Sequence, residues 1–159
     1  MTGRMSLAMV GGAAIVMVLA VGSSAQSSDP LLGAWKLNLA KSKYDPGPAP
    51  KAVSLKYEAV GKGMKVTVDG ETPTGPMHWG YSGDFDGKDN PVTGNPDVDA
   101  VALTRIGPLT TEVAMKKGGK VTTINTRVVS ADGKTLTITA KGTDAQGRPV
   151  HNVQVFDKQ

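Results

Sequence analysis

Short runs in which apolar and polar residues alternate one by one are the feature that most constrains this chain. In the stretch from Val53 to Tyr57, for example, Val53, Leu55 and Tyr57 are apolar, whereas Ser54 and Lys56 are polar. A period of two is typical of a β-strand with one buried face. Ten such runs follow one another, at 35–38, 51–59, 64–68, 77–85, 88–92, 98–106, 110–116, 120–129, 135–141 and 148–158. The pattern predicts an all-β protein.

Turn-forming residues separate these runs. The chain contains 20 glycines and 10 prolines, and we expect tight hairpins at Asp69-Gly70 and Asp132-Gly133, because Asp-Gly is a strong hairpin signal. The stretch 45–50 carries prolines at 46, 48 and 50, which exclude a regular strand and make a helix unfavourable there. We predict a surface loop at this position, either over the mouth of a barrel or as a plain semi-rigid connection.

Length and cysteine content bound the architecture. The chain has 159 residues, which is enough for one domain. It has no cysteine, so no disulfide can stabilise the fold. A closed sheet leaves no unpaired edge strand. We therefore predict a single antiparallel up-and-down β-barrel of about eight to ten strands. Small inward residues favour a pocket inside this barrel, and a flattened barrel with a solid core is the alternative.

The N-terminus has the pattern of a secretory leader. Arg4 precedes an uncharged run at 7–21, and small residues stand before a cleavage point after Ala25. The apolar run is shorter than the roughly 20 residues of a membrane-spanning helix, which favours cleavage over retention as an anchor. We predict a signal peptide at 1–25, a barrel domain at 26–159, a periplasmic or secreted location in a bacterium, and no membrane insertion after cleavage.

Charge and side-chain inventory argue against several function classes. The formal net charge is +4, but acidic and basic residues interleave, so we predict no nucleic-acid partner. His78 and His151 are the only histidines, too few to indicate a zinc site, and the Asp- and Asn-rich stretch 84–99 lacks the calcium-loop spacing. Ser82 lies near His78 without a nucleophile elbow. We predict no metal, no cofactor and no enzymatic activity.

A few large or charged residues inside the predicted strands are candidate ligand-binding residues. Trp79 and Tyr81 share one face of their strand, where they either line a pocket or pack in the core. Arg105 and Arg127 lie within strands and not at turns. If one of them points inward, it is a buried cation that a ligand carboxylate would neutralise; otherwise it lies on a solvated outer face.

The chain also resembles small secreted bacterial proteins with a lipocalin-like domain, within the calycin group of barrels. The residues that carry the resemblance are Gly33-Ala34-Trp35-Lys36-Leu37-Asn38, Lys41-Ser42-Lys43, Asp86-Gly87-Lys88, Pro91-Val92-Thr93-Gly94-Asn95-Pro96 and Gly142-Thr143-Asp144. The resemblance implies a barrel that Trp35 plugs at one end, with an internal cavity for a small apolar molecule, and it implies no reaction. The chain departs from fatty-acid-binding proteins, because Val150-His151-Asn152-Val153 stands in place of their Arg-x-Tyr pair and the proline-rich loop replaces their two helices.

Together these observations predict an exported protein that holds a small hydrophobic or amphipathic molecule non-covalently in its barrel. The candidate ligand-binding residues are Trp35, Trp79, Tyr81, Arg105 and Arg127. The alternative is a solid-core barrel that binds an envelope or extracellular protein through its loops. The volume enclosed by the barrel distinguishes the two hypotheses.

Overall fold

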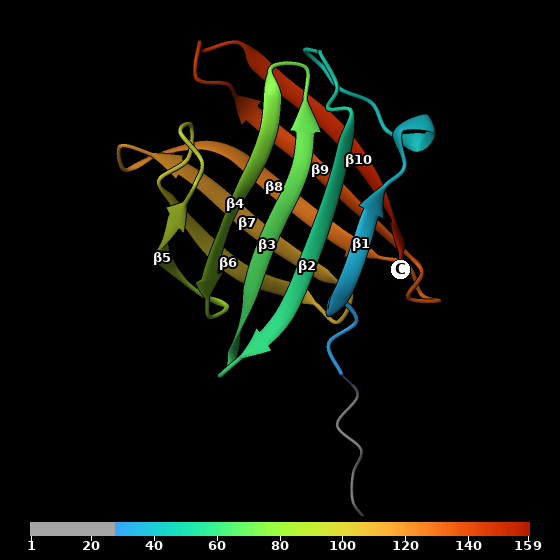
Figure 1. The fold of residues 1–159 in the computed structure, drawn as a ribbon. Helices are drawn as coiled ribbons and strands as arrows, with labels where there is room; N and C mark the ends of the chain where they lie inside the picture. The colour runs from blue at the N-terminus through green and yellow to red at the C-terminus, as the bar shows by residue number, and fades with distance from the viewer. Residues whose placement is uncertain (1–27) are drawn as a thin grey trace, which may run out of the picture.

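Ten antiparallel strands form a closed barrel (Figure 1). The computed structural model describes residues 28–159, and the predicted signal peptide at 1–25 lies outside them. The strands are β1 (Gly33–Leu37), β2 (Ala52–Val60), β3 (Gly63–Thr72), β4 (Gly75–Gly83), β5 (Asp86–Thr93), β6 (Ala100–Gly107), β7 (Thr110–Lys117), β8 (Lys120–Val129), β9 (Thr135–Thr143) and β10 (Pro149–Lys158). The predicted fold class is thereby confirmed.

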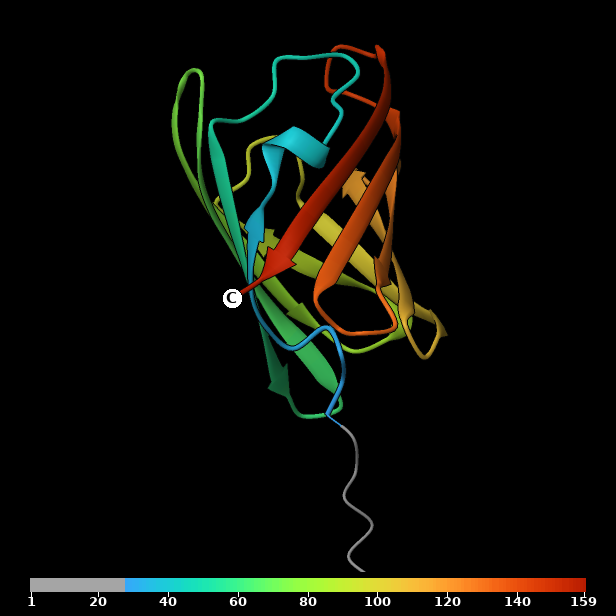
Figure 2. The same ribbon diagram turned by 90° about the vertical axis from the view of Figure 1, so that its right-hand side faces the viewer.

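Each strand pairs with the next one along the chain, and the pairing of β1 with β10 closes the ring. At this seam Trp35 lies opposite Lys158, and Leu37 lies opposite Phe156. The two views of the ribbon show the same meander wrapped around one interior (Figure 1, Figure 2). The β4–β5 seam is the shortest, because only Gly80–Thr93 and Tyr81–Val92 pair across it.

The alternating sequence explains which side chains fill the interior. In β2, Val53, Leu55 and Tyr57 are buried, while Ser54 and Lys56 between them are exposed. Successive side chains of a strand point to opposite faces of the sheet, so the apolar half of each run lies inside the barrel. The buried apolar core comprises Leu31, Trp35, Leu37, Val53, Leu55, Tyr57, Met64, Val66, Val68, Tyr81, Val101, Leu103, Val113, Met115, Val129, Leu136, Ile138 and Phe156.

Trp35 closes one end of the barrel. Its side chain is fully buried, and its indole N–H donates to the carbonyl oxygen of Leu31 at 2.8 Å. A hydrogen-bonded turn that Asp29 starts places Leu31 beneath the indole, where Leu31 is also buried. The Lys158 ammonium lies 4.7 Å from the centroid of the indole ring. The indole and Leu31 therefore pack together in the barrel interior at this end.

Helical structure is minimal in the described part of the chain. A single 3-10 turn, η1 (Leu39–Lys41), follows β1, and the side chain of Asn38 accepts a hydrogen bond from the backbone of Lys41. A membrane crossing by a helix needs a long apolar run, and no helix within residues 28–159 supplies one.

The hairpin predicted at Asp69-Gly70 is wrong. β3 continues through Gly70 to Thr72, and the chain reverses between Thr72 and Gly75. Gly70 serves a different purpose, because a Cβ atom there would lie 2.4 Å from the backbone oxygen of Ala52 on the neighbouring strand. The glycine permits close approach within the sheet, a role that the local sequence does not distinguish from a turn.

Candidate functional site

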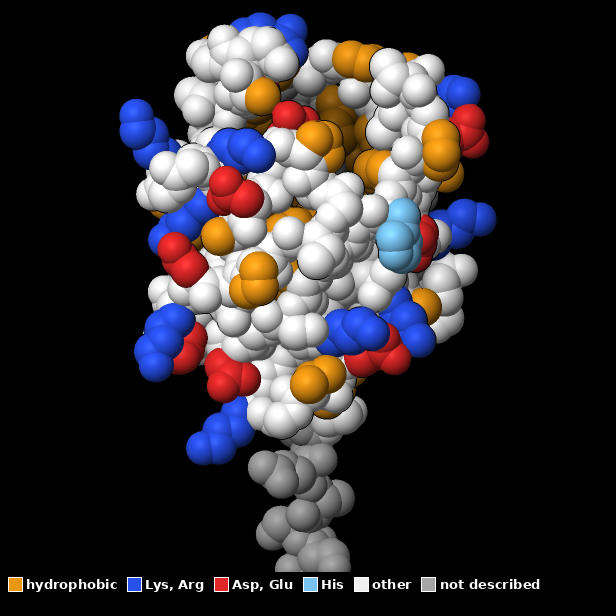
Figure 3. Space-filling view, turned by 60° about the vertical axis from the view of Figure 1, so that its left-hand side comes forward, with side chains coloured by type: hydrophobic (Ala, Val, Ile, Leu, Met, Phe, Trp, Pro, Cys, Tyr) orange, Lys and Arg blue, Asp and Glu red, His pale blue; other side chains and the backbone are white. Residues whose placement is uncertain are grey.

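A cavity of about 350 Å³ opens at the end of the barrel opposite Trp35. The space-filling view shows the molecule hollowed at this end, with hydrophobic side chains inside the recess (Figure 3). Twenty residues line it: Tyr44, Pro46, Pro48, Pro50, Val53, Leu55, Tyr57, Val66, Val68, Thr72, Pro73, Met77, Trp79, Met115, Asn125, Arg127, Ile138, Asn152, Gln154 and Phe156. Its volume lies within the usual range of small-molecule sites, roughly 300–1,000 Å³.

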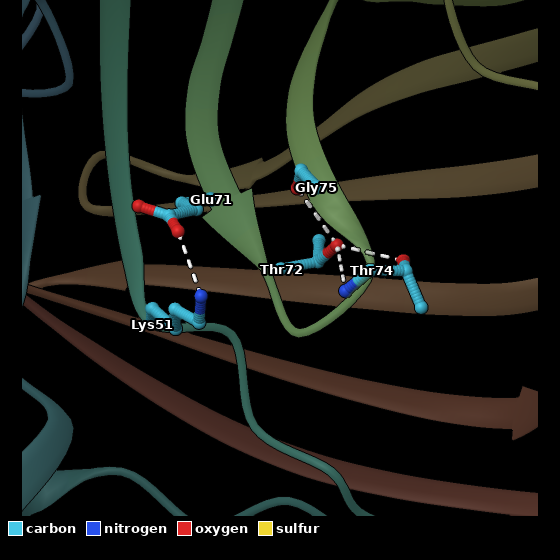
Figure 4. Close-up of polar contacts among 5 residues, drawn as sticks. All are labelled: Lys51, Glu71, Thr72, Thr74 and Gly75. Atoms are coloured by element: carbon cyan, nitrogen blue, oxygen red, sulfur yellow. Dashed lines mark hydrogen bonds and ion pairs between the residues drawn. The ribbon is translucent and has the colours of Figure 1, made fainter.

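The proline-rich loop 44–50 forms one side of the mouth, and its three prolines line the cavity. At the end of this loop, the Lys51 ammonium lies 2.8 Å from a carboxylate oxygen of Glu71 (Figure 4). The backbone N–H of Lys51 also donates to the Glu71 carbonyl oxygen. On its other side, the Asp45 N–H donates to Oδ1 of Asn152 at 2.9 Å. The loop predicted from the prolines is thus fixed to the barrel at both ends.

The β3–β4 hairpin forms a second part of the mouth. The hydroxyl of Thr72 donates to the carbonyl oxygen of Gly75 at 2.9 Å and accepts from the N–H of Thr74 at 3.3 Å (Figure 4). These bonds close the turn that brings Pro73 to the cavity. The mouth therefore has a rigid apolar border of proline rings.

One wall of the cavity is apolar and aromatic. The strand register places Leu55, Val68 and Trp79 in one row across β2, β3 and β4. The next row, farther from the mouth, is Tyr57, Val66 and Tyr81. The rings of Trp79 and Tyr81 lie 6.2 Å apart between centroids at an interplanar angle of 29°. The deep end of this wall carries two phenol groups.

The facing wall is polar. The register of β8, β9 and β10 places Asn125, Ala140 and Asn152 in one row, and Arg127, Ile138 and Gln154 in the next. Each row therefore has a small or apolar residue on β9 between polar residues on β8 and β10. Asn125, Asn152 and Gln154 line the cavity together with Arg127.

Arg127 is the dominant electrostatic feature of the cavity. It is only 4% exposed, and none of the salt bridges formed among residues 28–159 involves it. Its guanidinium carbon lies 5.6 Å from the ring centroid of Tyr57 and 6.0 Å from that of Tyr81. Arginine keeps its charge at any physiological pH. The barrel therefore encloses a cation whose nearest described partners are the two aromatic rings.

Several buried polar atoms in and beside the cavity lack a hydrogen-bond partner within the described chain. They are Arg127 Nε, Asn125 Oδ1, Thr111 Oγ1 and the hydroxyls of Tyr44, Tyr57 and Tyr81. Burial raises the pKa of Tyr57 to about 12, against a smaller opposing effect of the Arg127 charge, so its hydroxyl stays a neutral hydrogen-bond donor. Guanidinium and phenol groups at the deep end of the cavity thus all offer N–H or O–H donors.

Three of the five predicted ligand-binding residues lie in or beside this cavity. Trp79 and Arg127 line the cavity, and Tyr81 lies within cation–π distance of Arg127. Trp35 lies outside the cavity, in the closed end. Of the two arginines weighed as inward cations, Arg127 is the one in the cavity.

Arg105 has a different environment. Its guanidinium stacks over the ring of Phe85, 4.3 Å from the centroid, and forms an ion pair with Asp29. Both partners lie towards the closed end of the barrel, so this arginine helps to close that end. Its charge has a carboxylate partner, which the charge of Arg127 lacks among the described residues.

Sequence reasoning missed Tyr57, Asn125 and Asn152. Tyr57 alternates with Val53 and Leu55, and this pattern already places its ring inside the barrel. Asn125 stands two residues before Arg127 on β8, so any argument for an inward Arg127 also applies to Asn125. Asn152 carries no local signal of this kind.

The histidines lie away from the cavity. His78 contacts Asp69 at 2.5 Å on the outer face, and His151 is exposed. Within residues 28–159 no group of three or more His, Cys, Asp or Glu side chains is arranged to hold a metal ion. No family model and no curated protein matches the sequence.

Proposed function

We propose that this protein is an exported small-molecule-binding protein that holds an amphipathic organic anion non-covalently in its barrel. The anionic headgroup contacts Arg127 at the deep end, and the apolar body lies along the wall formed by β2, β3 and β4. The observation that carries this proposal is the buried guanidinium, without an acidic partner among residues 28–159, inside a cavity of about 350 Å³. Export rests on the leader pattern at 1–25.

The physical argument concerns the cost of burying a charge. An ion removed from water loses hydration worth several kcal/mol, and aromatic rings about 6 Å away return only part of it. A carboxylate next to the guanidinium would restore charge-assisted hydrogen bonds, two of them in the bidentate geometry. The tyrosine hydroxyls beside Arg127 would add neutral donors to the same headgroup.

The apolar wall and the proline-rich mouth account for the rest of the ligand. Leu55, Val68 and Trp79 occupy the row between the headgroup site and the mouth. Burial of an alkyl or aromatic body there contributes roughly 25 cal/mol for each Å² removed from water. The volume of the cavity favours this function over the alternative of a solid-core interaction module.

Three probes with the same alkyl chain test the proposal: dodecanoate, dodecan-1-ol and dodecyltrimethylammonium. Isothermal titration calorimetry with the barrel domain is expected to show the tightest binding for the anion. Arg127→Met removes the charge at nearly unchanged volume and should weaken dodecanoate binding about ten- to a hundredfold, as expected for hydrogen bonds to a charged group. Arg105→Met, the matched control, should leave the affinity unchanged.

Two results would contradict the proposal. One is equal or tighter binding of the neutral or cationic probe, because a buried guanidinium must discriminate against both. The other is an Arg127→Met variant that keeps the affinity of the native protein for dodecanoate.

A further inference from the structure

We infer that the cavity contains a second polar subsite, formed by Asn125 and Asn152, which selects a ligand with a hydrogen-bond donor on the edge that faces β8 and β10. The ligand class is a hydroxylated organic acid and not a plain alkyl carboxylate. This inference rests on the proposed function, since it assumes that the acid group lies at Arg127. We call the two side chains the amide subsite.

The register defines where the amide subsite lies relative to the headgroup. Asn125 precedes Arg127 by two residues on β8, which corresponds to about 7 Å along a strand. Asn152 contacts the mouth loop through the Asp45 N–H, so its row lies between Arg127 and the mouth. A ligand whose acid group reaches Arg127 from the mouth must pass this row.

Ala140 makes the amide subsite accessible. It stands between Asn125 and Asn152 in the same row. Strands in a sheet are about 4.8 Å apart, so the two asparagine backbones are separated by roughly 10 Å. A methyl side chain between them leaves space for a ligand group. In the row of Arg127 the corresponding residue is the larger Ile138.

The hydrogen bonds that the two amides already make indicate which kind of ligand group the amide subsite can bind. Oδ1 of Asn125 is buried and has no partner among the described residues. This atom is an acceptor, and neither a carboxylate nor an alkyl chain can donate to it. Oδ1 of Asn152 already accepts from the Asp45 N–H, which leaves the amide N–H groups of Asn152 for a ligand. A hydroxyl group can donate to Asn125, and an acceptor on the same ligand edge can bind Asn152.

The apolar wall opposite the amide subsite determines which way the hydroxyl of a ligand must face. Leu55, Val68 and Trp79 carry no hydroxyl, amide or carboxylate. Of these three side chains only Trp79 has a polar group, an indole N–H that donates but cannot accept. A ligand O–H turned towards this wall would find no acceptor, at a cost of about 1–3 kcal/mol in protein interiors. The cavity therefore suits a ligand whose polar groups lie on one edge and whose other edge is apolar.

The test compares dodecanoate with its 2-hydroxy, 3-hydroxy and 5-hydroxy derivatives by calorimetry on the native barrel. One isomer is expected to bind about three- to tenfold more tightly than dodecanoate, the gain from one neutral hydrogen bond. Asn125→Leu should abolish this preference, so that the hydroxylated isomer no longer binds more tightly than dodecanoate. Thr126→Val, on the outward side of the same strand, should keep the preference.

The outcomes separate this inference from the proposed function. If dodecanoate binds through Arg127 but every hydroxylated isomer binds equally or more weakly, the amide subsite is wrong and the anion site stands. This is also the result expected if a bound water already satisfies Asn125. If neither dodecanoate nor any isomer binds, both proposals fail. Whether an isomer binds more tightly than dodecanoate is measured on the native protein, so this comparison does not depend on the folding of a variant.

Discussion

Replacement of Arg127 by methionine should stabilise the ligand-free barrel while it impairs binding. Arg127 is 4% exposed as a residue, and its guanidinium has no carboxylate partner among residues 28–159. Methionine has a side chain of similar length, places no charge in the interior and adapts to irregular space. The substitution therefore removes an uncompensated charge without opening a large void.

The expected magnitude follows from the contacts of the guanidinium. The effective penalty for burying one ion is several kcal/mol. The rings of Tyr57 and Tyr81 lie 5.6 and 6.0 Å from the guanidinium carbon, near the outer limit of cation–π attraction, so each offsets about 1 kcal/mol. We expect Arg127→Met to raise the free energy of unfolding by about 2 kcal/mol, and the melting temperature of a domain this size by about 8 °C.

Thermal and urea unfolding of the ligand-free protein, followed by circular dichroism, measure this change. Arg105→Met is the control, because it removes an arginine that has both a carboxylate partner and an aromatic one. The control should be neutral or destabilising. If Arg127→Met lowers the free energy of unfolding by 1 kcal/mol or more, the buried cation is well compensated in the free protein, and the argument for an anionic ligand loses its basis.

Other variants test separate parts of the structure. The buried phenol of Tyr57 has a pKa of about 12 against an ordinary 10.0, so titration of this group should cost the native protein about 2 kcal/mol of stability between pH 10 and 12, and Tyr57→Phe should reduce this loss in urea unfolding across that range. Gly94→Ala should be about 2 kcal/mol more destabilising in thermal unfolding than Gly147→Ala, because both glycines have positive φ but only at Gly94 would a Cβ lie 2.3 Å from a backbone oxygen. Dodecanoate should quench the fluorescence of Trp35→Phe and not that of Trp79→Phe, since only Trp79 lines the cavity; the reverse pattern would place the ligand at the closed end.

The strands were largely predictable from residue alternation. The run predicted at 120–129 is β8 (Lys120–Val129), and the predicted barrel of up to ten strands has ten. Alternation succeeds because one face of every strand lies in a single interior, so a local pattern reports directly on burial. It fails at Gly70, where a glycine needed for close packing has the same local signature as a turn.

The arrangement of the candidate site was only partly predictable. Arg105 and Arg127 both occupy strand interiors, and the pairing register even places them in one row through Thr111. They differ because Arg105 lies beside the strand irregularity before Gly107, where it is exposed and pairs with Asp29, whereas Arg127 is buried. Asn125 and Asn152 become neighbours only through Ala140 on the strand between them. Such rows form after turns, bulges and closure have determined the register, and no short stretch of the chain contains that information.

The seam between β1 and β10 has a consequence for how the protein is made. Its two strands are the first and the last of the ten described strands, so the sheet keeps two unpaired edges until β10 is available to pair with β1. Joining distant segments is entropically costly and slow. Deletion of β10 should therefore leave an aggregation-prone open sheet, and a chaperone that shields β1 would have its main effect before β10 pairs with it.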